Sequence, residues 1–460
     1  LDAITIGSGD ATLDVNGFSI AGAKLVNNSG TIRNFAGDYN SNQIRNLKGG
    51  TVSVASGGTI RVTTGGLWNA GTILAAKEIH WAGNVSLTGG GALVLNDTRL
   101  LDPNVDQDVT DQYERMMSIA PGTTLRGTGE IFKQNIENSG LIEADVAQKG
   151  KGAPEKVLWF NGTIRNNGTI RVLNGGHINV NRPAIFNANG LITSGPGGGS
   201  LRLEMPFKML GSIGALGGGC YTPPPTKGFI RADGGDLEIV AGAMYEGRIQ
   251  RGPGGGVVKM AHVTTQNVFV DAGAELHFRP VLIYPNPNRT DLDQPFLTIG
   301  STFVAFDEMV QLITNNGTIR FTGGLIGNGS SGRMQTIISG TGELILEDAT
   351  IGSGTGDTFV NGAGHTIRGC GSINAPFLNE GTVALDCAPA KSARIGGKAV
   401  RQSYGYDGKP TVQAGASIEN RGRISIARAS VSISGPAEPL YLLQTATPTV
   451  VTNKGTIAAS

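Results

Sequence analysis

The stretch Asn161-Gly-Thr-Ile-Arg-Asn-Asn-Gly-Thr-Ile-Arg171 contains one small motif twice, and this motif decides the fold. Its full form is Asn-x-Gly-x-Ile/Val, and the first of these two copies is one residue shorter. Asn and Gly tolerate the left-handed backbone of a sharp corner, so the motif predicts a corner. The Thr-Ile-Arg that follows would place one apolar side chain inward and two polar ones outward, as in a short β-strand.

Copies of the motif recur along almost the whole chain. They begin at Asn28, Asn69, Asn138, Asn315, Asn379, Asn420 and Asn453. A corner followed by a short strand, repeated this often, predicts one architecture of stacked turns. The intervals from Gly140 to Gly162 and from Gly168 to Gly190 are both 22 residues, which fits one turn of such a stack.

Between the corners, apolar and polar residues alternate as they do in strands. Thr51-Val-Ser-Val54 and Thr59-Ile-Arg-Val62 are examples, and helical spacing is nearly absent. We therefore expect an all-β fold, a right-handed parallel β-helix (β-solenoid) with inserted loops, because right-handed winding is the default for connected parallel strands. Other β-solenoids are the alternatives. The isoleucines that follow the corners should stack in the core: Ile60, Ile164, Ile170, Ile319, Ile424 and Ile457.

A solenoid grows in one dimension, so we expect residues 1–460 to form a single continuous domain. Four stretches break the repeat and are predicted to be loops at its corners: 101–119, 206–228, 280–295 and 388–410. The first of these is acidic and has room for a short helix. Loops on a rigid scaffold are frequent sites of binding.

Composition excludes several classes of function. Gly accounts for 72 of 460 residues, far above the usual share of about 7%. The chain has 37 basic and 36 acidic residues without a basic block, which disfavours nucleic acid as a partner. No apolar run approaches the roughly 18 residues that span a bilayer. The chain starts at Leu1 without a signal peptide or an initiator Met, which suggests a mature product or a fragment.

The three cysteines are Cys220, Cys370 and Cys387. Cys370 and Cys387 lie 17 residues apart, close to one turn, so they can stack on adjacent turns and form a disulfide. Two buried thiols are an equal alternative. Cys220 would remain in a loop beside Pro223, where it could pair between subunits.

Carboxylates are candidate catalytic groups because some β-helices cleave polysaccharides. Glu343 and Glu347 should lie on the same face of one strand, with Asp348 next to them. Asp233 and Asp236 flank a Gly-Gly pair, and Arg231 lies two residues before Asp233. A glycosidase needs two carboxyl groups at one cleft, and one of them needs a tuned pKa. No Arg or His lies close in sequence to Glu343 and Glu347, so we expect surface charges or ion pairs rather than a catalytic site.

Metal sites are weakly indicated. Oxygen side chains alternate at Asp102, Asn104, Asp106 and Asp108, as in a calcium loop, but Gln107 and Tyr113 replace the expected Gly and Glu. A solvated acidic loop is the preferred interpretation. None of the five histidines lies at metal-ligand spacing from another: His80, His177, His262, His277 and His365.

Aromatic side chains are candidates for stacking on sugars. The candidates are Trp68, Trp81, Trp159, Tyr221, Tyr245, Tyr404 and Tyr406. Trp68 and Trp159 lie beside repeats, so we expect them to pack in the core or at corners. Tyr404 and Tyr406 are the better candidates for an exposed pair. Thr-x-Thr rows that would suggest an ice-binding face do not recur in register.

The stretch His365-Thr-Ile-Arg-Gly-Cys-Gly-Ser-Ile373, followed by Leu378-Asn-Glu-Gly-Thr-Val383, resembles the repeats of bacterial secreted β-helical proteins. Leu125-Arg-Gly-Thr-Gly-Glu-Ile131, followed by Asn138-Ser-Gly-Leu-Ile142, repeats this pairing, and Ile338-Ser-Gly-Thr-Gly-Glu-Leu344 matches its first half. These families include filamentous-haemagglutinin-like adhesins and autotransporter passengers. The resemblance implies a secreted, extracellular or cell-surface location and a structural or adhesive role, and it transfers no catalytic residue.

These observations favour an extracellular structural or adhesive protein, a subunit of a surface fibre that assembles end to end with copies of itself. A carbohydrate-active enzyme, a polysaccharide lyase or glycosidase, is one alternative. A carbohydrate-binding β-helix without catalysis is the other. We assign no catalytic, cofactor-binding or metal-binding residue from the sequence, and we expect no enzymatic activity and no cofactor. Surface carbohydrate is the possible partner besides the chain itself.

Overall fold

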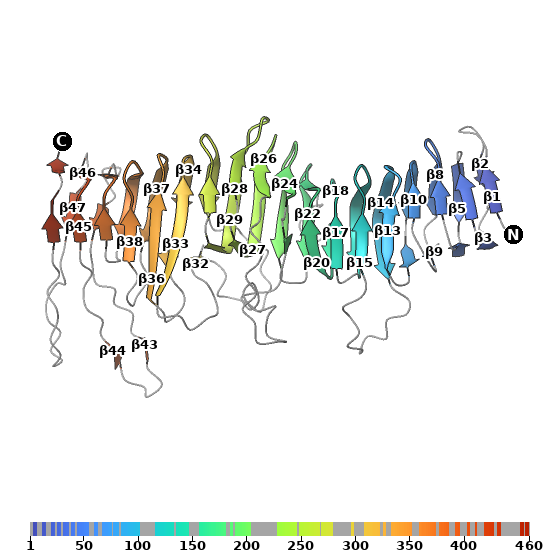
Figure 1. The fold of residues 1–460 in the computed structure, drawn as a ribbon, viewed down its shortest axis with the longest axis horizontal. Helices are drawn as coiled ribbons and strands as arrows, with labels where there is room; N and C mark the ends of the chain where they lie inside the picture. The colour runs from blue at the N-terminus through green and yellow to red at the C-terminus, as the bar shows by residue number, and fades with distance from the viewer. Residues whose placement is uncertain are drawn as a thin grey trace. The chain divides into compact units, whose positions relative to one another are not determined.

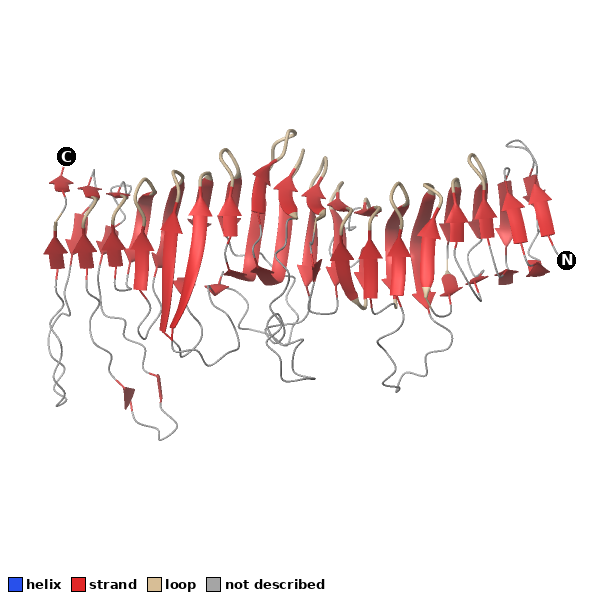
Figure 2. Cartoon of the chain, viewed as in Figure 1, coloured by secondary structure: helices blue, strands red, loops and turns tan. Residues whose placement is uncertain are grey.

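The computed structural model shows a β-helix of parallel strands connected by tight corners (Figure 1). The residues that it describes contain strands, turns and connecting segments and no helix (Figure 2). Nor is there, in this part of the chain, a helix long and apolar enough to cross a bilayer. The described residues are 3–6, 12–14, 20–23, 25–28, 31–35, 38–41, 44–54, 59–62, 67–75, 77–81, 84–101, 116–132, 135–146, 156–180, 185–186, 189–203, 228–245, 248–266, 268–278, 296–298, 308–322, 325–327, 333–351, 358–373, 377–385, 392–395, 403–404, 410–411, 418–426, 430–433, 451–454 and 456–459.

The chain divides into two compact units. Unit 1 comprises 1–206, 224–238 and 253–255, and unit 2 comprises 207–223, 239–252 and 256–460. Strand β27 (Leu237–Tyr245) has residues in both. Whether the chain is one continuous domain stays a prediction.

Unit 1 contains three columns of parallel strands, each strand hydrogen-bonded to its equivalent on the next turn. The first column holds β1 (Ala3–Ile6), β4 (Leu25–Asn28), β7 (Ile44–Asn46), β10 (Leu67–Asn69), β13 (Val85–Thr88), β15 (Met116–Ile119), β17 (Asn135–Asn138), β20 (Thr163–Asn166) and β23 (Ile185–Phe186). The second holds β2 (Thr12–Asp14), β5 (Thr31–Phe35), β8 (Thr51–Val54), β11 (Thr72–Ala75), β14 (Ala92–Leu101), β16 (Thr124–Ile131), β18 (Leu141–Ala144), β21 (Thr169–Val172), β24 (Leu191–Ser194) and β26 (Phe229–Ala232). The third holds β3 (Ile20–Ala23), β6 (Asp38–Ser41), β9 (Thr59–Val62), β12 (Glu78–Trp81), the distal halves of β14 and β16, β19 (Val157–Phe160), β22 (Gly176–Val180) and β25 (Gly199–Leu203).

Unit 2 repeats this arrangement. Its first column holds β28 (Arg248–Arg251), β30 (Val268–Val270), β33 (Glu308–Asn315), β36 (Arg333–Ser339), β38 (Thr358–Asn361), β40 (Phe377–Asn379), β45 (Ile418–Asn420) and β48 (Val451–Asn453). The second holds β29 (Val258–Gln266), β31 (Glu275–Phe278), β34 (Thr318–Thr322), β37 (Glu343–Ile351), β39 (Thr366–Ile373), β41 (Thr382–Leu385), β46 (Arg423–Ile426) and β49 (Thr456–Ala459). The third holds β32 (Phe296–Thr298), β35 (Leu325–Gly327), the distal halves of β37 and β39, β42 (Ser392–Ile395) and β47 (Ser430–Ile433). Only β43 (Ser403–Tyr404) and β44 (Pro410–Thr411) pair antiparallel among the registers described.

The central residue of each Thr-Ile-Arg strand points into the core, where equivalent residues stack turn on turn. In unit 1 this row contains Val52, Ile73, Leu93, Leu125, Ile142 and Ile170, each at most 1% exposed. In unit 2 it contains Leu276, Ile319, Leu344, Ile367, Val383 and Ile424, each at most 4% exposed. The expected core is thereby confirmed for Ile60, Ile164, Ile170, Ile319 and Ile424, and Ile457 lies in register with Ile424.

The corners differ from the sequence-based explanation. Among the described residues, the motif glycines, such as Gly71 and Gly422, do not have positive φ, and neither do the motif asparagines. A Cβ on Gly71 would lie 2.1 Å from the carbonyl oxygen of Gly50, and one on Gly422 would lie 2.1 Å from that of Gly381. Gly is therefore required because the backbone of the preceding turn is too close for a side chain, and the left-handed explanation is wrong for these corners.

The motif Asn makes two kinds of hydrogen bond that hold the corner. The Gly71 N–H donates to Oδ1 of Asn69 at 3.2 Å, within one turn. The Nδ2 of Asn69 donates to the carbonyl of Ala92 on the next turn at 2.8 Å. Asn138 and Asn315 make the same pair of contacts. Each of these Asn side chains is 0% exposed, so the motif both shapes a corner and links it to its neighbour.

The expected loops are only partly described. Met116–Ile119, in the expected loop 101–119, forms β15, because Met117 and Ile119 add to the core at 0% and 1% exposure. The expected loop 388–410 likewise contains β42 and β43. Loop 280–295 lies outside the described residues, as does loop 206–228 except for residue 228.

Candidate functional site

Glu343 and Glu347 lie on the outward face of β37, as their spacing predicts. Leu344 and Leu346, which alternate with them, are each 1% exposed and face the core. Between the two carboxylates on the outer face lies Ile345. This is the one place where the sequence proposes two carboxyl groups on the same strand face, and it is therefore the first candidate for a site.

Strands on both sides bring arginines to this face. The register places Arg320 of β34 and Arg368 of β39 on either side of Ile345. Ile345 is only 4% exposed although it points outward. Ile345 thus lies between two arginines, and long cationic side chains can cover apolar surface while their charged ends stay in water.

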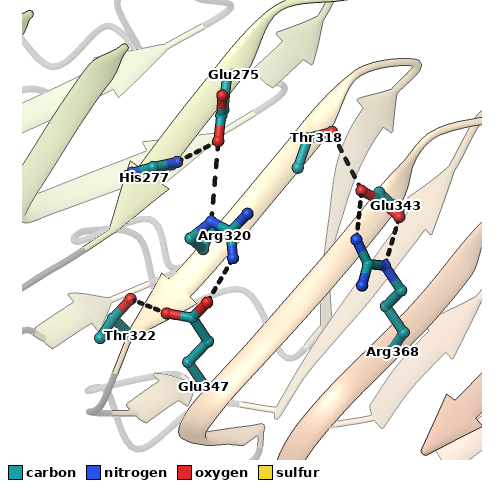
Figure 3. A network of polar contacts seen from close by, with 8 residues as sticks. All are labelled: Glu275, His277, Thr318, Arg320, Thr322, Glu343, Glu347 and Arg368. Carbon is teal, nitrogen blue, oxygen red and sulfur yellow. Dashed lines mark hydrogen bonds and ion pairs between the residues drawn. The ribbon is translucent and has the colours of Figure 1, made fainter. Parts of the chain in front are cut away.

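The guanidinium groups reach the carboxylates diagonally across the turns (Figure 3). Arg368 holds Glu343 with two bonds, from Nε to Oε2 at 2.6 Å and from Nη2 to Oε1 at 3.1 Å. Thr318 donates to Oε1 of the same carboxylate at 3.4 Å. Such two-pronged contacts are the strong form of an Arg–carboxylate pair.

Arg320 links two further carboxylates. It forms an ion pair with Glu347 through Nη1 and lies 3.8 Å through Nε from Oε1 of Glu275 on β31. Thr322 donates to Oε2 of Glu347 at 2.8 Å, and Nε2 of His277 lies 2.5 Å from Oε1 of Glu275. These contacts and those of Glu343 together connect four successive strands of the second column of unit 2, β31, β34, β37 and β39.

The electrostatics of this network favour ionised carboxylates. Hydrogen bonds from Arg368 hold the pKa of Glu343 below its usual value. Burial opposes ionisation of Glu347, but hydrogen bonds from Thr322 and Arg320 outweigh it, and the pKa of Glu347 is also lowered. A general acid for glycoside cleavage needs a raised pKa, so this pair has the properties of a turn-to-turn clamp rather than of an acid–base pair.

The other candidate carboxylates have structural contacts as well. Asp233 lies 3.4 Å from Nη2 of Arg231, which confirms the expected ion pair. Its Oδ1 also accepts a hydrogen bond from the Gly254 N–H at 2.7 Å. Asp348 adopts a positive φ of 56° at the point where the register of β37 and β39 shifts. It thus lies at a bulge on an exposed edge of the network.

The histidines make separate contacts. His80 binds Glu78 at 2.9 Å, His277 belongs to the network above, and His177 contacts Ser200. Within the described parts of the chain, no three His, Cys, Asp or Glu side chains cluster as metal ligands do. The calcium-like stretch with Asp102, Asn104, Asp106 and Asp108 lies outside the described residues.

His365 links two buried corner asparagines of unit 2, a role that the sequence analysis does not identify. It is 0% exposed, and its Nδ1 donates to Oδ1 of Asn361 at 2.7 Å while its Nε2 accepts from Nδ2 of Asn315 at 3.0 Å. Burial lowers the pKa of His365 to about 4, against a raising influence of Glu343. The signal in the sequence is that the corner at 340–342 lacks the motif Asn, and His365 of the next turn occupies its place.

The three tryptophans occupy two kinds of position, in the core and on the outward face. Trp81 is the one in the core, at 0% exposure. Trp68 and Trp159, expected to pack in the core or at corners, are partly exposed and occupy outward positions between buried neighbours on β10 and β19. Strand alternation sets this orientation, so Trp68 and Trp159 are not core residues; they lie one and two residues before the corner residues Asn69 and Asn161, and the corner alternative stays open. The side chains of Tyr221, Tyr245, Tyr404 and Tyr406 lie outside the described residues.

Cys370 is disulfide-bonded and 8% exposed. The other cysteines, Cys220 and Cys387, lie outside the described residues, so the pairing of Cys370 with Cys387 stays a prediction.

One row of threonines does lie in register on the second column of unit 1: Thr12, Thr31, Thr51 and Thr72. The next outward position on each strand lies two residues after the threonine. On β8 and β11 it is occupied by Ser53 and Leu74. A second threonine row is therefore missing at these turns, and the face does not have the Thr-x-Thr pattern.

In comparisons with known proteins, no family model matches the chain, and no curated protein matches it significantly.

Proposed function

We propose that the chain is an extracellular structural and adhesive β-helix, a subunit of a surface fibre. The observation that carries this proposal is that outward-facing charges of unit 2 form ion pairs between turns. Arg320 and Arg368 join carboxylates on different turns, so the residues that a catalytic cleft would require strengthen the stack instead. A stack of turns whose outward charges are paired between turns, as in unit 2, is suited to bearing load and presenting a surface.

The location outside the cell has separate support. Cys370 is disulfide-bonded, and stable disulfides belong mainly to exported proteins. Surface fibres must also resist unfolding and proteolysis, and buried Asn ladders pair the polar groups of the corners that would otherwise open first.

The partner we propose for the fibre is a second copy of the chain. We place this contact between strand β2, which pairs in parallel with β5, and strand β49, which pairs in parallel with β46. Both strands belong to second columns: Leu13 lies in register with Ile32, and Ile457 lies in register with Ile424. We propose that Thr12–Asp14 of one copy pairs with Thr456–Ala459 of the next, a contact that repeats without closing.

A charge exchange tests this contact in the 460-residue chain. Lysine at both Thr12 and Thr456 would place like charges opposite each other across the contact and should abolish fibres. The matched control, Thr12→Lys with Thr456→Glu, should restore them. Electron microscopy and light scattering distinguish the outcomes, and a monodisperse unmodified chain at high concentration would refute end-to-end assembly.

The enzymatic alternative has its own test. We expect no release of products from pectin, alginate or hyaluronan, because Glu343 and Glu347 are ionised and held by arginines. Product release that Glu343→Gln abolishes would show that the network is a catalytic site after all.

A further inference from the structure

Trp159 lies on the outward face of the third column of unit 1. Its neighbours Leu158 and Phe160 on β19 face the core at 0% exposure, and Trp159 points outward and is partly exposed. Its indole N–H has no acceptor among the described residues. A large flat ring on the outer face of a strand, with a donor that no neighbouring side chain occupies, offers a ligand both an apolar surface and a hydrogen bond.

The neighbouring turns surround Trp159 with polar and aromatic groups. Glu130 lies beside it in register on β16, and Nδ2 of Asn161 donates to Oε1 of Glu130 at 3.1 Å. The guanidinium of Arg99 lies 3.6 Å from Oε2 of Glu130 and 5.3 Å from the centre of the Phe132 ring. We name these five residues, Arg99, Glu130, Phe132, Trp159 and Asn161, the Trp159 face.

The Trp159 face is polar but carries no net charge. Arg99 and Glu130 neutralise each other and remain accessible, with side chains 53% and 37% exposed. The hydrogen-bonding groups of this cluster therefore include a carboxylate acceptor, a guanidinium donor and an amide that can do both. Arg99 and Glu130 lie on paired strands, and Asn161 directly follows β19 with its N–H bonded to the carbonyl of Ile131 at 2.9 Å, so their arrangement exists before a ligand arrives.

We propose that the Trp159 face binds a neutral glycan. A pyranose ring has an apolar C–H face that can stack on the indole of Trp159, and hydroxyls at its edge that can bond with Glu130, Asn161 and Arg99. This assignment specifies a ligand for the adhesive function proposed above and rests on it.

Other ligands fit this surface less well. A polyanion needs cations that are not already neutralised, and Arg99 is paired with Glu130. The apolar side chains of a peptide would remove Arg99 and Glu130 from water without offering them hydrogen bonds. A sugar hydroxyl can donate or accept, so it can bind either group without breaking their pairing.

The test is isothermal titration of the full chain with neutral hexasaccharides, namely cellohexaose, maltohexaose, xylohexaose and mannohexaose, with heparin and polygalacturonate as anionic probes. We expect at least one neutral hexasaccharide to bind with an affinity that salt does not change. Trp159→Ala should weaken that binding by about tenfold or more, the effect of losing one stacked ring. Trp68→Ala is the matched control, because Trp68 is also outward and partly exposed, and it should leave the affinity unchanged.

If Trp159→Ala does not fold, as judged by its thermal unfolding, Asn161→Ala should weaken binding of the same sugar severalfold. Absence of binding to every neutral probe, binding of the anionic probes alone, or equal affinity in folded Trp159→Ala would each overturn the assignment. Fibre formation is measured separately by light scattering. A chain that forms fibres without binding sugar would refute this site alone, and a sugar-binding monomer would refute the fibre alone.

Discussion

In both units, buried side chains at the corners hydrogen-bond from one turn to the next, and we call each such series a corner ladder. The two ladders use different side chains. In unit 1, Nδ2 of Asn46 donates to Oδ1 of Asn69 at 2.7 Å, and both side chains are amides. In unit 2 the chain of bonds runs from Asn315 through His365 to Asn361, and Nδ2 of Asn361 donates to Oδ1 of Asn379 at 2.8 Å. Both ladders satisfy buried polar groups, but only the second contains a group that titrates.

The difference teaches that an interruption in the repeat can be repaired from the next turn. The corner at 340–342 has no motif Asn, and the longer imidazole of His365 spans the gap back to Asn315. The repair makes unit 2 sensitive to acid, because a charged imidazole at this buried position would have no counterion in contact and would lose its acceptor nitrogen. An amide ladder has no such sensitivity.

The largest effect should occur in both units, because each has a core of stacked apolar side chains. Ile73→Ala in unit 1 and Ile367→Ala in unit 2 each remove a side chain that is 0% exposed. Each should lower the free energy of unfolding by about 2–5 kcal/mol. Urea denaturation would measure this, with Leu74→Ala as the control because Leu74 is 39% exposed beside Ile73. Equal losses at Leu74 and Ile73 would contradict the assigned core.

The next largest effect should be a loss of stability at low pH, which we expect in unit 2 and not in unit 1. The pKa of His365 is about 4 in the folded chain and 6.5 without burial, so the unfolded state binds the proton first. Stability from neutral His365 is present above pH 6.5 and is lost as the pH falls toward 4, a loss on the order of 3 kcal/mol.

Urea midpoints between pH 7 and pH 4 would show this loss, and His365→Asn should flatten the curve through that window. Glu343 is the charged group that acts on His365, and its own lowered pKa keeps it ionised over most of this range. An unchanged pH profile in His365→Asn would mean that other groups cause the acid sensitivity.

The amide ladder of unit 1 should respond to mutation but not to pH. Asn69→Ala removes the Oδ1 that accepts from the Gly71 N–H and from Asn46, and the Nδ2 that donates to the carbonyl of Ala92; leaving a buried polar group unpaired costs about 1–3 kcal/mol. We expect the same loss at pH 7 and at pH 5. A loss that grows as the pH falls would contradict the contrast between the ladders.

The smallest effect should come from the surface network of unit 2. Arg320→Ala removes contacts with Glu347 and Glu275, but these side chains are 30–41% exposed. We expect a loss of at most about 1 kcal/mol, smaller at high salt, because water and ions screen exposed pairs. Thermal unfolding at low and high salt measures it, and a loss of several kcal/mol would give the network a larger structural role than proposed.

The all-β class, the stacking of turns and the core residues could be predicted from the sequence alone. Corners and strand alternation are local properties, since a Thr-Ile-Arg segment such as Thr169–Arg171 sorts its side chains by a period of two wherever it lies. The inward position of Ile170 and the shared face of Glu343 and Glu347 follow directly from this period.

Contacts between turns were decided only by the tertiary structure, because the number of residues per turn varies. Hydrogen-bonded corner asparagines are 23 residues apart at Asn46 and Asn69 and 28 apart at Asn138 and Asn166. With an uneven period, sequence distance does not tell which arginine meets Glu343 or Glu347, nor that His365 reaches Asn315. The close approach of neighbouring turns, which excludes any side chain at Gly71, is likewise a property of the stack and not of the local chain.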